Sequence, residues 1–447
     1  MKMHTTPHIH ACHVVIIGGG LAGLASAISL HRAGHRATVL ERTGEFVNIG
    51  GLIHLPPNAC RALRSLGVLD GIMRLPGIAF EPQHISLLAY DTGDMLKRMD
   101  LIPNMRQTYG LPYLTVQRAS LHQCLLKYTV DLGATVEFNT LIDSIDFDLP
   151  SIRLAGNRLI NADLIIGADG ENSTCRSMLL GRPDPPLHFG HQIFSCDIPL
   201  SAIDDNHPDL QCFVSDPGTS WWLGPGTMAI ATIMKGQHEY LNLMGGLIDP
   251  EPTEVRGRPK DLSKQVVKDS FVNWSPVINK LVGLSISCNT WTSTVTPVLR
   301  KWCHPSGRFS LLGDAAHAMT PYLAQGAAQC FEDAVALGTI MSRVSSGEQI
   351  PEALGLYHMM REPRCQRLKD VSIKLRDVYC AHEGPAQRRR DHDLQHCEPK
   401  QGFVIPWLDP EFQAWMYAYD VEREAIVACA GRELGNAIGR PFDEEIL

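Results

Sequence analysis

The chain has 447 residues, which is more than one hydrophobic core usually serves and suits two intertwined domains. Hydrophobic residues make up 44% and charged residues 20%, as in a globular protein, and a net charge of -8 excludes a general basic field for nucleic acid. The 13 cysteines are scattered singly with no Cys-x-x-Cys pair, which favours reduced thiols in a cytoplasmic protein over a disulfide framework.

The N-terminal leader carries His8, His10, Cys12 and His13 at a spacing that could suit a metal ion. A short polar terminus usually frays, however, so we expect no metal site. The nearly uncharged run 11–30 could be mistaken for a membrane span, but it contains four glycines and lacks a basic lead segment. We therefore expect neither a membrane span nor a secretory signal.

The same run predicts a strand, a tight glycine turn and a helix, because the letters HVVII are followed by GGGLAG and an Ala/Leu/Ser stretch. Gly18 can take the turn, Gly20 lets the backbone approach a pyrophosphate, and Gly23 permits close packing of helix on strand. A second strand, ATVLE, ends in Glu41, 18 residues past Gly23, where a carboxylate can bind a ribose. The pattern predicts an adenine dinucleotide site and leaves FAD and NAD both open.

Two later segments each predict a strand that ends in a polar turn. NADLIIGADGENSTCR gives a buried strand over 162–166 and then Asp169-Gly170. GRFSLLGDAAHAMTPYLAQGAAQC gives a strand, then Asp314, then an Ala-rich helix that opens near Gly326. An aspartate at the carboxyl end of a strand is where an open α/β sheet places its ligand contacts.

Together these segments resemble the FAD-dependent aromatic hydroxylases of the para-hydroxybenzoate and salicylate hydroxylase type, especially the salicylate-hydroxylase-like monooxygenases of fungal secondary metabolism. The similarity runs from about His13 to Glu424 and includes GGGLAG, ERTGEFVNIGGLIHLPPN, TVQRASLHQCL, IGADGENSTCR and LLGDAAHAMTPYLAQGAAQCFEDA. It implies noncovalently bound FAD as the resident dinucleotide. It also implies NADH or NADPH as a co-substrate without a Rossmann domain of its own, and only one glycine cradle is visible in the chain.

The resemblance implies an α/β fold: a Rossmann-like FAD-binding domain with an inserted β-sheet substrate domain and a C-terminal helical segment. We expect the FAD-binding domain over residues 1–85, 108–182 and 295–375, the substrate domain over 86–107 and 183–294, and the helical segment over 376–447. The inserted sheet should roof the flavin ring. The charged run 388–390 is expected to be a solvated helix face.

The matching positions imply which residues hold the cofactor. They are Gly18, Gly20, Gly23, Glu41, Arg42, Gly51, Arg118, Asp169, Asp314, Gly326 and Ala327. Asp314 would hold the ribityl and pyrophosphate region, and Asp169 would also help to bind the nicotinamide cofactor. Gly326 and Ala327 would offer amides of a helix N-terminus to the flavin's pyrimidine oxygen, which carries negative charge in reduced flavin. Pro321 would lie by the reactive edge of the ring.

The implied reaction inserts one oxygen atom of dioxygen into an aromatic or alkene substrate by way of a flavin hydroperoxide. The cofactor carries the hard chemistry, and the protein must add an apolar, water-poor pocket and a group that orients the substrate. The aromatic side chains that could line this pocket are Phe194, Trp221, Trp222 and Tyr322.

The sequence departs from its relatives at three places. Ser195 and Thr232 stand near the positions where some relatives have an arginine and a tyrosine that together bind a phenolate. Without that pair, a neutral ring, such as an indole, or an alkene is favoured as the substrate. Leu52 stands where relatives usually have glycine, and His54 follows where the chain should pass the flavin. We therefore treat His54 as a candidate for substrate contact.

Two alternatives stay open at this point. A flavin oxidase or dehydrogenase would share the fold without inserting oxygen, and oxygen-18 incorporation separates the two. A catalytically inactive FAD-binding partner protein would show no NAD(P)H-dependent flavin reduction. For the hydroxylase we expect a small-molecule substrate and dioxygen as partners, no nucleic acid, and a monomer or homodimer.

Overall fold

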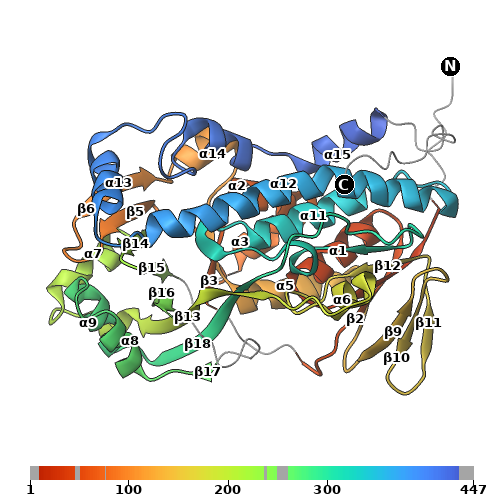
Figure 1. The fold of residues 1–447 in the computed structure, drawn as a ribbon, viewed down its shortest axis with the longest axis horizontal. Coiled ribbons are helices and arrows are strands. Elements are labelled where there is room, and N and C mark those ends of the chain that lie inside the picture. The colour runs from red at the N-terminus through yellow and green to blue at the C-terminus, as the bar shows by residue number, and fades with distance from the viewer. Residues whose placement is uncertain (1–9, 46–50, 76, 236–238, 249–259, 432–447) are drawn as a thin grey trace.

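The computed structural model describes residues 10–45, 51–75, 77–235, 239–248 and 260–431 (Figure 1). A five-stranded parallel sheet has the order β19 (Phe309–Leu311), β12 (Leu164–Gly167), β1 (His13–Ile17), β2 (Arg36–Leu40) and β8 (Thr135–Glu137). An eight-stranded, mostly antiparallel sheet has the order β17 (Lys260–Asp261), β18 (Ser287–Val295), β13 (Leu187–Pro199), β16 (Tyr240–Ile248), β15 (Thr227–Met234), β14 (Thr219–Gly224), β5 (His84–Ala89) and β6 (Met95–Asp100). The arrangement confirms the expected α/β fold class.

Two three-stranded sheets complete the strands, in the orders β3 (Leu52–Leu55), β7 (Leu114–Gln117), β4 (Ala79–Phe80) and β11 (Leu159–Asn161), β10 (Ser151–Leu154), β9 (Ile142–Asp146). The helices are α1 (Leu21–Arg32), α2 (Pro57–Ser65), α3 (Leu69–Arg74), α4 (Asn104–Tyr109), α5 (Arg118–Asp131), α6 (Thr174–Leu180), α7 (Gln211–Ser215), α8 (Lys264–Ser270), α9 (Pro276–Leu284), α10 (Asp314–His317), α11 (Gly326–Met341), α12 (Ile350–Tyr379), α13 (Pro385–His396), α14 (Pro410–Tyr417) and α15 (Val421–Ala430).

The parallel sheet is buried because its strands are short runs of β-branched and aliphatic residues. β1, β12 and β19 are buried almost throughout, and α1 and α11 pack against each other beside them in the largest hydrophobic core. The Ala- and Gly-rich sequences of these two helices permit their close approach. This rigid layer fixes the turns that follow the strands.

The eight-stranded sheet has two different faces because successive side chains of a strand point to opposite sides. The outer face packs against α8 and α9. The inner face packs against the end of α12 and the helices that follow it. The long helix α12 spans both halves of the molecule (Figure 1).

Two of the aromatic residues expected to line a pocket lie on the outer face instead. Trp222 packs near Phe213, and Phe194 packs edge-on against Phe271, both in the outer core. Trp221 points inward, as alternation along β14 requires once its neighbour points outward.

The run 388–390 is not wholly solvated, contrary to expectation. Arg388 and Arg389 are exposed, but Arg390 is buried and donates hydrogen bonds to the carbonyls of Val378 and Tyr379, at 2.9 and 3.0 Å. Arg390 therefore ties α13 to the last turn of α12.

Among the described residues, no helix is both long and apolar enough to cross a membrane.

Candidate functional site

Four of the expected cofactor residues gather where neighbouring parallel strands end. Gly18 follows β1, Glu41 follows β2, Asp169 comes shortly after β12, and Asp314 comes shortly after β19. Since these four strands are adjacent and parallel, their carboxyl ends share one edge of the sheet. That edge is the usual ligand site of an open α/β sheet.

The glycine turn has both a packed and an open part. Gly18 has a φ of 106°, and a Cβ atom there would lie 2.4 Å from the carbonyl oxygen of Ala168. A Cβ atom on Gly23 would lie 1.9 Å from the carbonyl oxygen of Gly18, so both glycines are required by packing. Around Gly20 the Cβ position has no atom within 4 Å, and no side chain caps α1. This exposed backbone at a helix start fits a phosphate group.

Glu41 is held beside this turn. One carboxylate oxygen accepts a hydrogen bond from the amide of Gly19 at 2.8 Å, and the other accepts from the amide and hydroxyl of Thr43 at 2.8 and 2.9 Å. Two further residues predicted to bind the cofactor lie nearby, and the side chains of both, Arg42 and Arg118, are exposed. The amide of Arg118 donates to the carbonyl of Gly51 at 3.3 Å, which brings these two predicted residues together.

A second open helix start lies at α11. It begins at Gly326, as predicted, after the buried residue Gln325, and no side chain caps it. No atom lies within 4 Å of the Cβ position of Gly326. Asp314 is half-buried, and its carboxylate has no hydrogen bond to another described residue. Amides at α11 and an unpaired carboxylate at α10 are donors and an acceptor of the kind that a flavin and its ribityl chain require.

Asp169 positions its own turn. Its oxygens accept hydrogen bonds from the hydroxyl of Ser173 at 2.5 Å and from the amide of Cys175 at 3.0 Å, so it anchors the start of α6. Sequence reasoning missed Glu171, two residues later, which accepts a hydrogen bond from Thr294 of β18 at 2.6 Å. Burial, together with the nearby charge of Asp314, raises the pKa of Glu171. Glu171 thus links the sheet edge to the eight-stranded sheet.

His54 lies on β3, with its ring facing two aromatic rings. The centroid distances are 5.8 Å to Tyr113 and 6.1 Å to Trp221. Burial lowers the pKa of His54 to about 4, so the imidazole is neutral at physiological pH. Both Nδ1 of His54 and Nε1 of Trp221 are excluded from solvent and have no hydrogen-bond partner. Buried polar atoms usually have a hydrogen-bond partner, so these two atoms are available to a bound group.

Ser195 and Thr232 share the inner face of the eight-stranded sheet with Asn242, which sequence reasoning missed. The Asn242 side-chain amide donates to Oγ of Ser195 at 2.8 Å and to Asp197 at 2.7 Å, and Asn242 lies opposite Thr232 in the register. A Cβ atom on Gly51 would lie 3.1 Å from Oγ of Ser195. Gly51 therefore lies directly against a patch of neutral and acidic side chains, and among the described residues no cationic side chain forms a hydrogen bond with Ser195, Asn242 or Asp197.

A buried ionic network lies behind the cofactor turns. Glu332 and Asp333 of α11 pair with Arg361 of α12, at 2.7 and 2.8 Å, and all three side chains are fully buried. Asp333 also accepts hydrogen bonds from the amide of Gly313 at 3.0 Å and from Nε2 of His317 at 2.7 Å. The network therefore holds the turn that carries Asp314.

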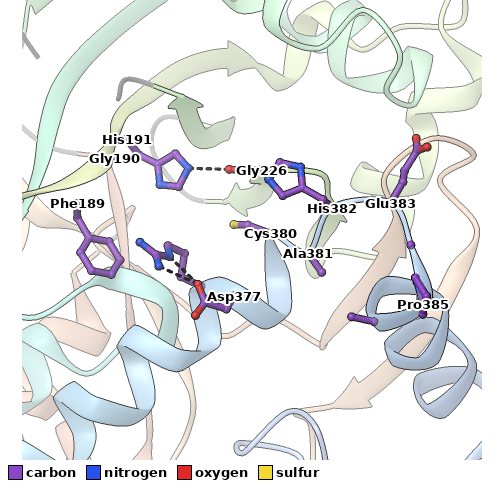
Figure 2. A pocket seen from close by; sticks show the side chains of 13 residues that line it. Phe189, Gly190, His191, Gly226, Asp377, Cys380, Ala381, His382, Glu383 and Pro385 are labelled. Carbon is purple, nitrogen blue, oxygen red and sulfur yellow. Dashed lines mark hydrogen bonds and ion pairs between the residues drawn. The ribbon is translucent and has the colours of Figure 1, made fainter. Parts of the chain in front are cut away.

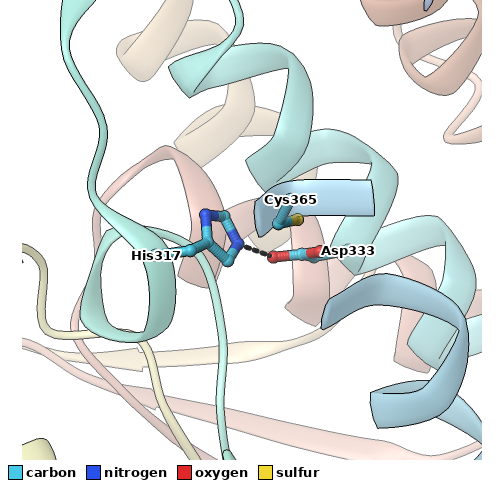
Figure 3. A group of neighbouring side chains, drawn as sticks. All are labelled: His317, Asp333 and Cys365. Carbon is cyan, nitrogen blue, oxygen red and sulfur yellow. Dashed lines mark hydrogen bonds and ion pairs between the residues drawn. The ribbon is translucent and has the colours of Figure 1, made fainter. Parts of the chain in front are cut away.

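His317, Asp333 and Cys365 lie close enough to suggest a metal site (Figure 3). Burial would lower the pKa of His317, but Cys365 and Asp333 raise it overall to about 10, so the imidazole is protonated. A protonated histidine and the guanidinium of Arg361 already neutralise Asp333. This cluster is an ion-pair network, and a cation would be repelled from it. In the N-terminal leader, His8 lies outside the described residues, and Nε2 of His13 forms a hydrogen bond with the hydroxyl of Thr38.

A pocket of about 570 Å³ opens between the start of β13 and the end of α12 (Figure 2). Arg376 lies over the ring of Phe189 at 4.4 Å and forms an ion pair with Asp377 at 2.8 Å. His191 forms part of the wall; its Nε2 donates to a carbonyl, and its Nδ1 accepts from the hydroxyl of Tyr322 at 3.3 Å. Tyr322 directly follows Pro321, the residue predicted to lie by the reactive edge of the flavin.

The chain is similar to several known proteins. Residues 11–372 match a family model described as FAD binding domain. The chain is 32% identical over 428 residues to FAD-dependent monooxygenase OpS4 of Beauveria bassiana (strain ARSEF 2860), covering 94% of this chain and 98% of that one. It is 30% identical over 372 residues to hispidin-3-hydroxylase of Neonothopanus nambi, covering 79% and 86%. The fold matches that of a salicylate hydroxylase substrate complex with a TM-score of 0.75 and 19% identity, covering 94% and 98%.

Proposed function

Because this chain belongs to the FAD binding domain family and is an FAD-dependent monooxygenase of the aromatic hydroxylase type, we propose that it consumes NADH or NADPH and oxygenates a neutral aromatic ring or an alkene in secondary metabolism. The observation that supports the substrate class is the inner-face patch of Ser195, Asn242 and Asp197, which offers hydrogen bonds and a negative charge but, among the described residues, no bonded cation for a phenolate. The free thiols of the described chain suit a reducing compartment, and we place the protein in the cytoplasm.

The residues at the sheet edge would hold FAD without a covalent bond. The open backbone at Gly20 would take the pyrophosphate, Glu41 the adenosine ribose, Asp314 the ribityl region, and the first amides of α11 the pyrimidine oxygen. Bound FAD supplies the two-electron reduction and the activation of dioxygen.

His54 and Trp221 would bind the organic substrate, since each offers an unpaired ring nitrogen in a water-excluded position. The neutral His54 can orient a donor or an acceptor without adding charge to the pocket. Trp221, Tyr379 and Trp407 form an aromatic wall beside it, with centroid distances of 5.9 and 5.7 Å from Trp221. Such a wall excludes water from the oxygenation step.

Replacing His54 with alanine should leave FAD affinity close to normal and lower kcat/KM for the organic substrate by about threefold to tenfold, the effect of one neutral hydrogen bond. FAD titration and steady-state turnover measure the two quantities.

A matched pair of tryptophan variants separates contact with the substrate from packing. Trp221→Phe removes an inward N–H and should also lower kcat/KM, whereas Trp222→Phe makes the same change on the outer face and should not. Normal turnover of His54→Ala would return His54 to a structural role.

The oxidation of NAD(P)H should be slow alone and about tenfold faster with the physiological substrate. A protein with one dinucleotide cradle must expose its flavin to the nicotinamide and then enclose it, and a substrate shifts that equilibrium only by its differential affinity. Tenfold needs about 1.4 kcal/mol of coupling. The substrate is the metabolite that accumulates when the gene is deleted from its host, and absorbance of NAD(P)H measures the rate. Equal rates with and without it would contradict the proposed function.

A further inference from the structure

Cys196 and Cys288 form a cross-strand pair in the eight-stranded sheet. They lie directly opposite each other on the antiparallel strands β13 and β18, and their sulfur atoms are 2.7 Å apart. Both residues are buried on the outer face of the sheet, away from the inner-face patch. All 13 cysteines of the chain are free thiols in the structure.

The environment makes the two thiols unequal. Cys196 donates a hydrogen bond to the sulfur of Cys288, and this bond lowers the pKa of Cys288, against the effect of burial. The ammonium of Lys264 lowers it further. The same hydrogen bond, with burial, raises the pKa of Cys196. Because the thiolate is the reactive form, Cys288 is the nucleophile of the pair and Cys196 the resolving thiol.

We propose that Cys196 and Cys288 are a modification site at which hydrogen peroxide closes a disulfide between β13 and β18. The thiolate of Cys288 attacks one peroxide oxygen, so an S–O bond forms, the O–O bond breaks and hydroxide leaves. The sulfur of Cys196 then loses its proton and attacks the sulfur of Cys288, so an S–S bond forms and the S–O bond breaks. In sum, two thiols and one hydrogen peroxide give one disulfide and two water molecules.

The geometry needs little movement for this reaction. Opposite residues of an antiparallel pair have Cβ atoms about 4.5–5.5 Å apart, and a disulfide requires about 3.5–4.5 Å. The sulfur atoms already lie within about an ångström of the S–S bond length of ~2.05 Å. Cys288 keeps 8% of its surface exposed, whereas Cys196 keeps none, so peroxide meets Cys288 first.

The bond would lock the strand that carries Ser195 to its neighbour, immediately behind the inner-face patch. Hydrogen peroxide would come from turnover without substrate, and this source alone rests on the proposed function. Peroxide added from outside tests the site independently of the flavin chemistry.

The test uses the purified full-length protein with FAD bound, treated with a small excess of hydrogen peroxide, unfolded in guanidinium chloride with N-ethylmaleimide present, digested and analysed by mass spectrometry. We expect one linked peptide pair that joins Cys196 to Cys288, two fewer alkylated thiols, and a melting temperature raised by several degrees. Cys212 is exposed and serves as the internal comparison. The proposal is overturned if both residues remain alkylated thiols after Cys212 has been oxidised, or if either one links to Cys212.

Two variants test the order of attack. With dimedone present, Cys196→Ser should accumulate a sulfenic acid adduct on Cys288, while Cys288→Ser should leave Cys196 as a thiol. An adduct on Cys196 in Cys288→Ser would overturn the assigned roles. A final sample receives NAD(P)H and air without substrate, with and without catalase. A disulfide that forms with added peroxide but not in this sample would contradict turnover without substrate as the source of the peroxide, while leaving the site and the proposed function intact.

Discussion

Replacing Arg361 with methionine should lower the free energy of unfolding by about 3–5 kcal/mol, because it leaves two buried carboxylates short of a cation. In the folded protein Arg361 donates to Glu332 at 2.7 Å and to Asp333 at 2.8 Å, with no exposed surface on any of the three side chains. Burial alone would raise the pKa of Glu332, but Arg364 and Arg361 lower it overall, so both cations hold that carboxylate ionised. Urea unfolding measures the loss.

The matched control is Arg388→Met, the same change at an exposed position on α13, which should alter stability by less than about 0.5 kcal/mol. Arg361→Met should also weaken FAD binding, because Asp333 fixes the amide of Gly313 beside Asp314. Equal stability of the two variants would show that the network does not support the fold.

Replacing Asp314 with alanine should weaken FAD binding by about one to two decades, the effect of losing one charge-assisted hydrogen bond worth roughly 1.5–3 kcal/mol. Asp314 is half-buried at the sheet edge, and its carboxylate has no hydrogen bond to another described residue. The variant should fold normally, because it breaks no hydrogen bond or ion pair between that side chain and another described residue. Equilibrium titration of the apoprotein with FAD, followed by flavin fluorescence, measures the change.

Asp314→Asn keeps an acceptor without the charge and should lose less affinity than Asp314→Ala. Asp143→Ala, on the exposed face of β9, removes a carboxylate far from the sheet edge and should bind FAD as the parent does. Unchanged FAD affinity in Asp314→Ala would remove Asp314 from the site.

The local elements of the site could be predicted because their cause is local. The strand at His13–Ile17 and the helix that opens at Gly326 lie where the sequence places them. A run of β-branched residues, a glycine turn and an Ala-rich stretch each impose their conformation within a few residues. The order of the motifs, together with the parallel sheet, then brings Gly18, Asp169 and Asp314 to one edge.

The remaining features depend on contacts between distant segments. The facing of Trp221 and Trp222 follows from which side of β14 meets α12, and strand alternation alone leaves both choices open. Asn242 on β16 donates to Ser195 on the neighbouring strand β13, and Glu332 on α11 pairs with Arg361 on α12. No local pattern marks such partners, so Glu171, Asn242 and the buried network emerged only with the fold.

Incorporation of labelled dioxygen tests the central claim most directly. The purified protein is supplied with NAD(P)H, 18O2 and the metabolite that accumulates in the deletion strain, and product and water are analysed by mass spectrometry. A monooxygenase should place one labelled atom in the product and the other in water. A product without label, with all consumed oxygen recovered as hydrogen peroxide, would make this chain a flavin oxidase and contradict the account.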